Sequence, residues 1–240
     1  MAGEDGAVPG PGPRSGPSRA ALLARLPLAV ALMVAIFFLP AGRLDWYPAW
    51  ALIAVYLAFL GVYGVWVLRR DPGQLAERRR PGANVKKWDR ALMRAYTVLL
   101  VAMLVLAGLD AGRFGWTSTP AALRAAGWAV MAAAGAWILW VSRSNTFLSS
   151  YVRIQEDRGQ QVVSRGPYRW VRHPMYAGII ALVVCIPVVL GSWWGLVPAG
   201  LIAALFVART ELEDRTLQAE LPGYREYAAR VRYRLVPGVY

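Results

Sequence analysis

Hydrophobic positions along this chain form long uninterrupted runs, and polar positions fill the short gaps between them. The second, third and fourth runs cover residues 46–68, 91–109 and 121–141, and hold 23, 19 and 21 residues. At 1.5 Å per residue, helices of this length cross a hydrocarbon core of about 30 Å. Because a lipid-exposed backbone must satisfy its own hydrogen bonds, the pattern predicts an all-α bundle of transmembrane helices.

Three further runs bring the number of predicted transmembrane helices to about six. Within residues 20–40, the apolar stretch LPLAVALMVAIFFLP follows Arg14, Arg19 and Arg25 and resembles a signal peptide with a cleavage site near Ala41. The five apolar segments that come after it favour a first membrane anchor instead. The last two runs, 175–190 and 193–208, hold 16 residues each, so each reaches only about 24 Å. They form either a thin hairpin or one that stops short of the far surface.

The distribution of Lys and Arg over the gaps predicts the topology. The gaps on one side carry 22 of these residues, and they are 1–19, 69–90, 142–174 and 209–240. The gaps on the other side carry two, and they are 41–45, 110–120 and 191–192. Cytoplasmic loops are enriched in positive charge, so we expect a multi-pass protein of the cell membrane with both termini in the cytoplasm.

Composition narrows the classes of function. The net charge is +13, but the basic residues form no separate domain, so attraction to anionic lipid explains them better than nucleic-acid binding does. One cysteine, Cys185, rules out an intramolecular disulfide, and one histidine leaves little scope for a His/Cys metal site. Residues 1–19 are rich in Gly, Pro and Ala and predict a disordered cytoplasmic tail, followed by a single membrane domain over 20–240.

The gap before the fifth apolar run ends in the motif GPYRWVRHPMYAG. Pro174 has no N–H and suits the first position of a helix, so the helix should begin there with His173 at its cap. The free N–H groups and positive dipole of that end favour a carboxylate or phosphate, and Arg172 adds a full charge. The first turn carries Tyr176 and Gly178, where glycine permits close approach of a ligand. A plain cap at an interface rich in Arg and aromatics is the alternative interpretation.

A second polar motif, RTELEDRTL, follows the sixth apolar run. Arg209 lies four residues before Glu213, and Thr210 lies four before Asp214, so each pair shares a helix face. The first motif begins the last hairpin and the second leaves it, so we expect the two to be neighbours in space. A solvated, salt-bridged helix beside the membrane is the alternative.

The C-terminal segment shows the pattern of a surface helix. After Pro222 and Gly223, the residues Tyr224, Tyr227 and Val231 share one helical face. The following RYRLVP alternates basic and apolar residues. We interpret this segment as an amphipathic cytoplasmic lid that lies on the lipid headgroups.

Together, these motifs resemble the superfamily of isoprenylcysteine carboxyl methyltransferases and phospholipid methyltransferases. Its members are integral membrane enzymes with a G-x-Y-x-x-x-R-H-P-x-Y core and a Glu-Glu-x-x-Leu core. The similarity covers residues 140–240. It implies S-adenosylmethionine as the cofactor, enclosed by the Arg-His-Pro-x-Tyr segment and the acidic pair.

The resemblance also assigns roles to individual residues. The residues that it places at the cofactor are Arg172, His173, Tyr176, Gly178, Glu213 and Asp214. Arg209, which precedes the acidic run, would orient a substrate carboxylate. An amine or thiol substrate would have to lose a proton, and His173, the only histidine, is then the candidate base. Two departures stand out: Asp214 replaces the second Glu, and residues 125–141 lack the arginine that carboxyl methyltransferases carry deep in this helix. The second departure argues against methylation of a prenylcysteine carboxylate.

A site bounded by membrane helices suggests a lipid-like acceptor that enters from the bilayer. Prenylated cysteine carboxylates, phospholipid amines and similar isoprenoids or thiols all fit this description. Two alternatives are an NADPH-dependent sterol-type reductase, whose C-terminus is also similar, and a non-catalytic small membrane protein or transporter. The transporter gains little support, because the ionisable groups within apolar runs lie near the ends of the spans.

The charge pattern generates a topology prediction. Single cysteines introduced at Gly73 and at Ser118 should be labelled from opposite sides of the membrane by an impermeant maleimide. The protein without an introduced cysteine is the control, because Cys185 lies in an apolar run. Equal accessibility of both positions from one side would refute the six-span arrangement.

Overall fold

The computed structural model describes residues 19–79 and 84–240, with side chains from residue 27 onward. The chain divides into two compact units, Met1–Ala35 and Ile36–Tyr240. The described part of the first unit is helical, and the predicted tail lies, except for Arg19, outside the described residues. No β-strand occurs in the part of the chain that the structure describes, which confirms the all-α prediction.

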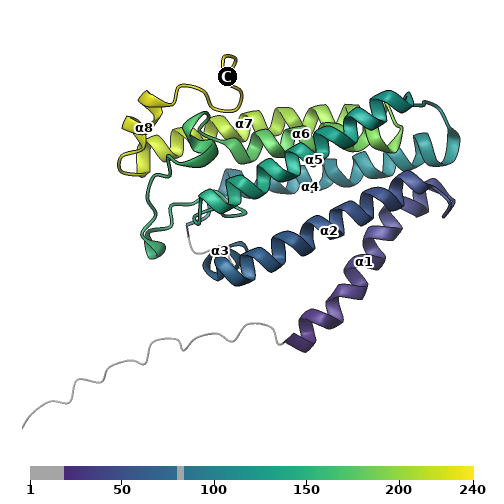
Figure 1. Ribbon diagram of the computed structural model, residues 1–240, viewed down its shortest axis with the longest axis horizontal. Helices are drawn as coiled ribbons and strands as arrows, with labels where there is room; N and C mark the ends of the chain where they lie inside the picture. Colours follow the sequence, from purple (N-terminus) through teal and green to yellow (C-terminus); the bar gives the residue numbers. More distant parts are fainter. Residues whose placement is uncertain (1–18, 80–83) are drawn as a thin grey trace, which may run out of the picture. The chain divides into compact units, whose positions relative to one another are not determined.

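All six apolar runs are helical (Figure 1). The helices are α1 (Arg19–Ala41), α2 (Tyr47–Arg70), α4 (Lys87–Ala107), α5 (Ala121–Ser144), α6 (Pro174–Leu190) and α7 (Leu196–Glu220). Three segments are long and apolar enough to cross a membrane, namely Tyr47–Arg70, Lys87–Phe114 and Ala121–Ser144. Pro27–Ala41 and α6 are shorter apolar helices. The number of spans and their orientation stay predictions.

The sixth apolar run differs from its predicted bounds. The helix begins at Leu196 instead of residue 193, and it continues past residue 208 to Glu220. The delayed start follows from the turn between α6 and α7, where Gly191 adopts φ 93° and Trp193 is tied to a neighbouring loop. The backbone N–H of Trp193 donates to Thr117 Oγ1 over 3.0 Å. The second polar motif is therefore the continuation of α7.

The polar gaps contain short helices. These are α3 (Pro72–Arg79), the turns η2 (Glu156–Arg158) and η3 (Gly166–Arg169), and α8 (Tyr224–Arg230). A π-helical turn, η1 (Gly108–Phe114), extends α4. Tyr224 and Tyr227 of α8 are buried and pack against Leu221. The predicted lid is thus a short helix that docks on the protein, and Val231 lies beyond its end.

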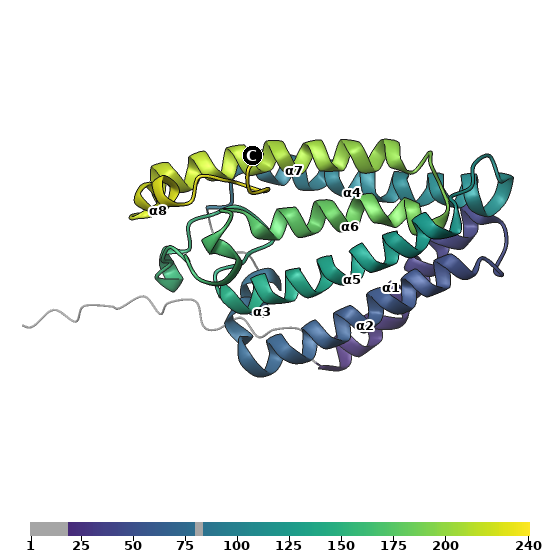
Figure 2. The same ribbon diagram turned by 45° about the horizontal axis from the view of Figure 1, so that its top comes forward.

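Helix α6 is the centre of the Ile36–Tyr240 unit. It packs against α2, α4, α5 and α7, and α4 lies along α7 (Figures 1 and 2). Between apolar helices in lipid, close packing replaces the hydrophobic effect as the source of stability, and small residues permit it. A Cβ on Gly127 of α5 would lie 3.0 Å from Val189 Cγ1, and one on Gly178 of α6 would lie 2.7 Å from Ile138 Cγ1. Glycine at both positions lets α5 and α6 approach closely.

The α4–α5 connection and the α6–α7 turn lie at the same end of the unit (Figure 1). A buried carboxylate holds them together. Asp110 of η1 is fully buried. It accepts hydrogen bonds from the backbone N–H and the hydroxyl of Thr117, over 2.8 and 2.6 Å. The hydroxyl of Ser192 donates to it over 2.6 Å. Asp110 therefore fixes the α4–α5 connection to the α6–α7 turn.

Replacing this carboxylate should destabilise the bundle. In Asp110→Ala the donors of the partly buried Thr117 and the buried Ser192 lose a charged acceptor, at a cost of about 1.5–3 kcal/mol. We expect the apparent melting temperature in detergent to fall by about 3–12 °C. Asp45→Ala is the control, because Asp45 forms an exposed pair with Arg43 and such pairs contribute little. Equal melting temperatures for the two variants would contradict the role of Asp110.

Candidate active site

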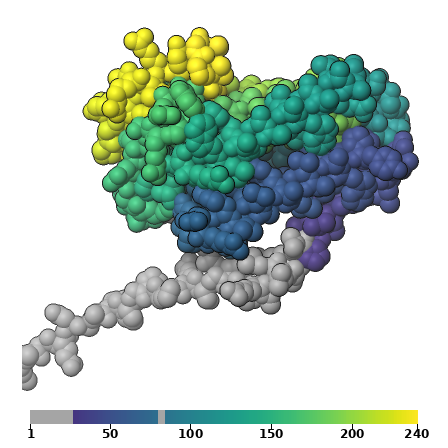
Figure 3. Space-filling model, in the orientation of Figure 1, coloured from purple at the N-terminus to yellow at the C-terminus, as the bar shows by residue number. Residues whose placement is uncertain are grey.

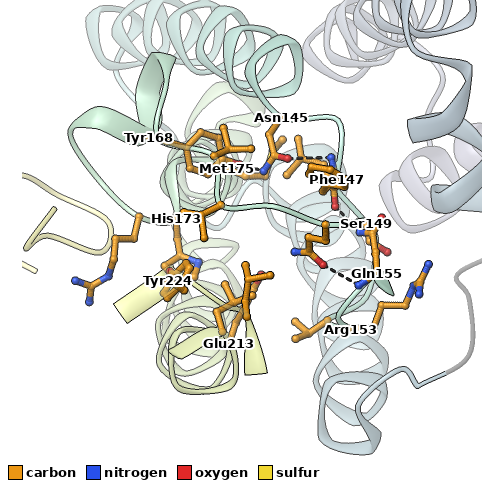
Figure 4. Close-up of a pocket in the computed structure, with 18 of the residues that line it drawn as sticks. Asn145, Phe147, Ser149, Arg153, Gln155, Tyr168, His173, Met175, Glu213 and Tyr224 are labelled. Carbon is orange, nitrogen blue, oxygen red and sulfur yellow. Dashed lines mark hydrogen bonds between the residues drawn. The ribbon is translucent and has the colours of Figure 1, made fainter. Parts of the chain in front are cut away.

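A cavity of about 120 Å³ lies at the other end of the unit, where the two polar motifs meet. Its walls come from α3, the segment after α5, η3, the start of α6, the second half of α7, and α8. Figure 4 shows Asn145 and Tyr168 on one side of the cavity, with Glu213 and Tyr224 on the other. Of the predicted site residues, those that line it are Arg172, His173, Tyr176 and Glu213.

The first motif folds as the sequence predicts at its helix start. Helix α6 begins at Pro174, with His173 at the cap position. The backbone N–H groups of Arg172 and His173 donate to the carbonyls of Tyr233 and Arg234, over 3.0 and 2.8 Å. The C-terminal segment is thereby held against the start of α6.

Gly166 determines how the chain approaches that helix. Its φ is +60°, a conformation that favours glycine. A Cβ at this position would also overlap the side chain of Ser144. Tyr168 follows in η3, where its hydroxyl accepts a hydrogen bond from Asn145 Nδ2 over 2.9 Å and its carbonyl accepts one from Tyr227 over 2.7 Å. Glycine and these two contacts fix the wall that Tyr168 contributes.

Asp214 lies at the centre of a hydrogen-bond network beside the cavity, and its side chain is fully buried. It accepts bidentate bonds from Arg172, with both N–O distances 2.9 Å, and a bond of 3.0 Å from the Tyr224 hydroxyl. His173 Nε2 lies 3.3 Å from the same carboxylate, and Arg234 donates over 3.1 Å. Burial alone would raise the pKa of Asp214, but hydrogen bonds from His173 and Arg172 and the positive charge of Arg172 lower it well below its usual value. Asp214 therefore stays ionised.

Arg172 is fully engaged by the protein. Two of its guanidinium nitrogens bind Asp214, and the third donates to the carbonyls of Ala228, Val231 and Arg232 over 2.9–3.3 Å. A ligand carboxylate would have to compete with these partners. Arg172 therefore lies at the cavity wall, but its guanidinium is bound to Asp214 and to backbone carbonyls.

Glu213 and Tyr176 join the two motifs inside the cavity. The Tyr176 hydroxyl donates a hydrogen bond to Glu213 Oε2. The Tyr176 ring is stacked on the His173 ring, with centroids 5.8 Å apart and planes 5° apart. These contacts confirm that the motifs are neighbours in space, although they lie almost 40 residues apart. A carboxylate, a phenol and an imidazole therefore face one enclosed space.

Arg209 lies behind Tyr176 and is not part of the cavity lining. Its guanidinium sits 5.0 Å from the Tyr176 ring centroid. It binds the fully buried Asp89 of α4 over 2.7 and 3.1 Å, and it also donates to the carbonyl of Ser150. Asp89 in turn accepts from the backbone N–H of Val152 over 2.7 Å. The predicted substrate clamp is thus bound to a carboxylate that our sequence analysis had missed.

Gly178 also lies away from the cavity lining. It faces Ile138 and Trp137 of α5. The Trp137 indole donates to the carbonyl of Pro174 over 2.8 Å, which fixes the first turn of α6 against α5. The close approach that glycine permits here is between two helices. Its proposed role at the cofactor stays a prediction.

The remaining wall is the segment 145–163, which a buried ion pair holds in place. Arg153 binds Glu77 of α3 over 2.7 and 2.8 Å, and both side chains are less than 5% exposed. The hydrogen bond from Arg153 lowers the pKa of Glu77 below its usual value, so the pair stays charged. Ser149 donates to the same carboxylate over 3.0 Å. This pairing ties α3 to the loop that closes the cavity.

Arg78 of α3 is a cavity residue that the sequence analysis missed. It lines the cavity, and its guanidinium carbon lies 5.3 Å from the centroid of the Tyr63 ring. Its Nε is buried and has no hydrogen-bond partner among the described residues. The only available signal was its position in the basic gap between the second and third apolar runs. No group of acidic, His or Cys side chains suited to a metal occurs in the residues described.

Comparison with known proteins supports the resemblance. Residues 122–221 match the model of the family described as phospholipid methyltransferase. This segment contains all but the first residue of α5, together with α6, α7 and both polar motifs. A search of curated proteins finds no match. The family match confirms the predicted resemblance to the superfamily of integral membrane methyltransferases, and it indicates methyltransferase activity at a membrane.

Glu213 and Asp214 should contribute differently to the stability of the protein, because their contacts differ. Asp214→Asn removes a buried charge from its arginine partners, which costs about 3–5 kcal/mol. We expect the apparent melting temperature in detergent to fall by about 6–20 °C. Glu213→Gln keeps an acceptor for Tyr176, so its melting temperature should stay within about 3 °C of the wild type. A larger loss for Glu213→Gln than for Asp214→Asn would reverse the assignment.

Proposed function

We propose that this protein transfers a methyl group from S-adenosylmethionine to the amine of a membrane phospholipid headgroup. One observation carries the proposal. His173, Tyr176 and Glu213 line one cavity at the polar ends of apolar helices, inside the segment that matches the phospholipid methyltransferase family.

The chemistry of the cavity suits this cofactor, which bears a sulfonium, an ammonium, a carboxylate and a ribose diol. Glu213 offers a carboxylate, and one of its oxygens remains available beside the bond from Tyr176. The aromatic rings of Tyr168 and Tyr224 are surfaces that attract a cation. Arg78 offers a guanidinium whose Nε has no partner among the described residues. Acidic, aromatic and basic groups are thus all present in one space.

The proposed residue roles differ in part from those implied by the resemblance. Glu213 would accept hydrogen bonds from the cofactor's ammonium, and Arg78 would hold its carboxylate, because Arg172 is committed to Asp214. Ligand cavities usually enclose about 300–1,000 Å³, more than the 120 Å³ here. The segment 145–163 would therefore have to shift outward as the cofactor enters. When bound, the cofactor supplies an electrophilic methyl group on sulfur.

The charges around the cavity favour an amine acceptor over a carboxylate. A carboxylate acceptor needs a free cation to hold it. Arg209 and Arg153 are bound to carboxylates, and Arg78 is assigned to the carboxylate of the cofactor. Glu213 would attract a protonated amine and repel a carboxylate. We therefore propose that Arg209 is a positioning residue, which acts through Tyr176 and the segment around Ser150.

A protonated amine must lose a proton before it can attack a methyl group. His173 is the proposed base. If its Nε2–H donates to Asp214, the lone pair of Nδ1 is the atom that can accept the proton. Asp214 would then hold the ring in one orientation and stabilise its protonated form.

Methyl transfer in lipid nanodiscs tests the proposal. Protein in discs that contain phosphatidylethanolamine should transfer label from methyl-labelled S-adenosylmethionine to the lipid amine. Glu213→Gln removes one charged interaction, worth about 1.5–3 kcal/mol. We expect cofactor affinity, measured by titration calorimetry, to fall by about 10- to 150-fold.

The matched control is Glu226→Gln, which changes an exposed glutamate on α8 and should leave cofactor affinity unchanged. Unchanged affinity in both Glu213→Gln and His173→Ala would overturn the cofactor assignment. Label recovered as a base-labile methyl ester on a prenylated cysteine, with none on the lipid amine, would overturn the amine assignment.

A further inference from the structure

A second hollow, of about 520 Å³, lies outside the candidate active site. Its arginines come from three different elements: Arg70 ends α2, Arg143 lies in the last turn of α5, and Arg165 precedes η3. Trp66, Asp71 and Thr146 complete the lining. The surfaces of α2 (blue) and of α5 with its following loop (teal to green) meet on the face that Figure 3 shows.

The positive charge of this hollow is not neutralised by neighbouring carboxylates. Arg143 lies over the Trp66 ring, 5.9 Å from its centroid, and Arg165 Nε donates to the carbonyl of Ser144 over 3.2 Å. Within 27–79 and 84–240, none of the three arginines forms an ion pair with an acidic side chain. Asp71 is the one acidic residue in the lining, and its Oδ1 accepts from the backbone N–H of Gln74. Three positive charges therefore stand against one negative charge.

This arrangement contrasts with the arginines that frame the active site. Arg153, Arg172 and Arg209 are buried and each is bound to a carboxylate. Arg70, Arg143 and Arg165 are exposed. Guanidinium groups with free donors match the geometry of phosphate oxygens. The hollow is therefore suited to an anion that arrives from outside the protein.

The surroundings of the hollow are apolar on the side of the helices. Val62 of α2 is 55% exposed, and it lies four residues before Trp66 on the helix face that leads to Arg70. Trp140 of α5 is also exposed. Tryptophans at the end of an apolar helix are typical of the membrane interface. A ligand that places a phosphate among the arginines would have an apolar surface directly beside it.

We propose that this hollow binds the phosphate of an anionic phospholipid, with the acyl chains lying along the exposed face of α2. A lipid satisfies both parts of the surface, whereas free phosphate would use the arginines alone. A zwitterionic headgroup carries a positive charge close to its phosphate, so the excess of arginines selects against it. The site is a binding site for lipid and takes no part in methyl transfer.

Lipid titration by native mass spectrometry tests this assignment. Delipidated full-length protein in detergent would be titrated with phosphatidylglycerol, phosphatidylcholine or inorganic phosphate. We expect the wild type to retain phosphatidylglycerol in preference to phosphatidylcholine. Arg143→Gln and Arg165→Gln should each weaken phosphatidylglycerol binding about fivefold, which corresponds to about 1 kcal/mol per arginine, and the double variant about 25-fold.

The control is Arg169→Gln, which removes the same charge from the same loop. Arg169 is exposed and lies over Trp170, 5.4 Å from the ring centroid, and it is not in the lining of the hollow. Its removal should leave binding unchanged, and Arg143→Lys, which keeps the charge, should weaken binding less than Arg143→Gln. Melting temperatures of all variants show whether each is folded.

Three outcomes would overturn the proposal. They are equal phosphatidylglycerol affinity in the wild type and the folded double variant, an equal loss in Arg169→Gln, and displacement of the lipid by millimolar inorganic phosphate. The last outcome would identify a site for a soluble anion. No measurement in this test depends on methyl transfer, so its result is independent of the proposed function.

Discussion

The polar end of this protein depends on the burial of one carboxylate, that of Asp214. A buried charge persists in a folded protein only when charges and hydrogen bonds compensate it. Here the compensation comes from the segment before α6, from α8 and from the C-terminal segment, through Arg172, Tyr224 and Arg234. Satisfying Asp214 therefore brings together three of the elements that enclose the cavity.

Two further ion pairs hold together the elements around the cavity in the same way. Arg209 with Asp89 joins α7 to α4, and Arg153 joins the segment after α5 to Glu77 of α3. In each pair the guanidinium and the carboxylate bind each other, so neither group is free to bind a ligand. What remains inside the cavity is Glu213, Arg78, which we assign to the carboxylate of the cofactor, and the neutral or titratable rings around them. This division is the reason why we favour an acceptor that carries positive charge.

One short segment links the cavity to the lipid-facing surface. Asn145 and Phe147 line the cavity, whereas Thr146 between them lines the basic hollow. The side chain of Gln74 holds this segment, because its amide donates to the carbonyl of Asn145 over 2.8 Å. The arginines that hold the walls of the cavity together are paired with carboxylates, whereas those of the hollow form no ion pair within the described residues. That difference suits one surface to a reaction and the other to lipid.

The sequence by itself determined the helices and the proximity of the two motifs. Apolar length and the proline at position 174 are local properties, so they predict a helix whatever surrounds it. Only the tertiary structure decided which charges pair, because neighbouring helix positions point about 100° apart and their partners lie far away in sequence. Glu213 therefore faces the cavity, whereas Asp214 faces its arginine partners. Arg209 binds Asp89, which lies 120 residues away in the sequence. Gly178 likewise faces α5, a contact that no local pattern contains.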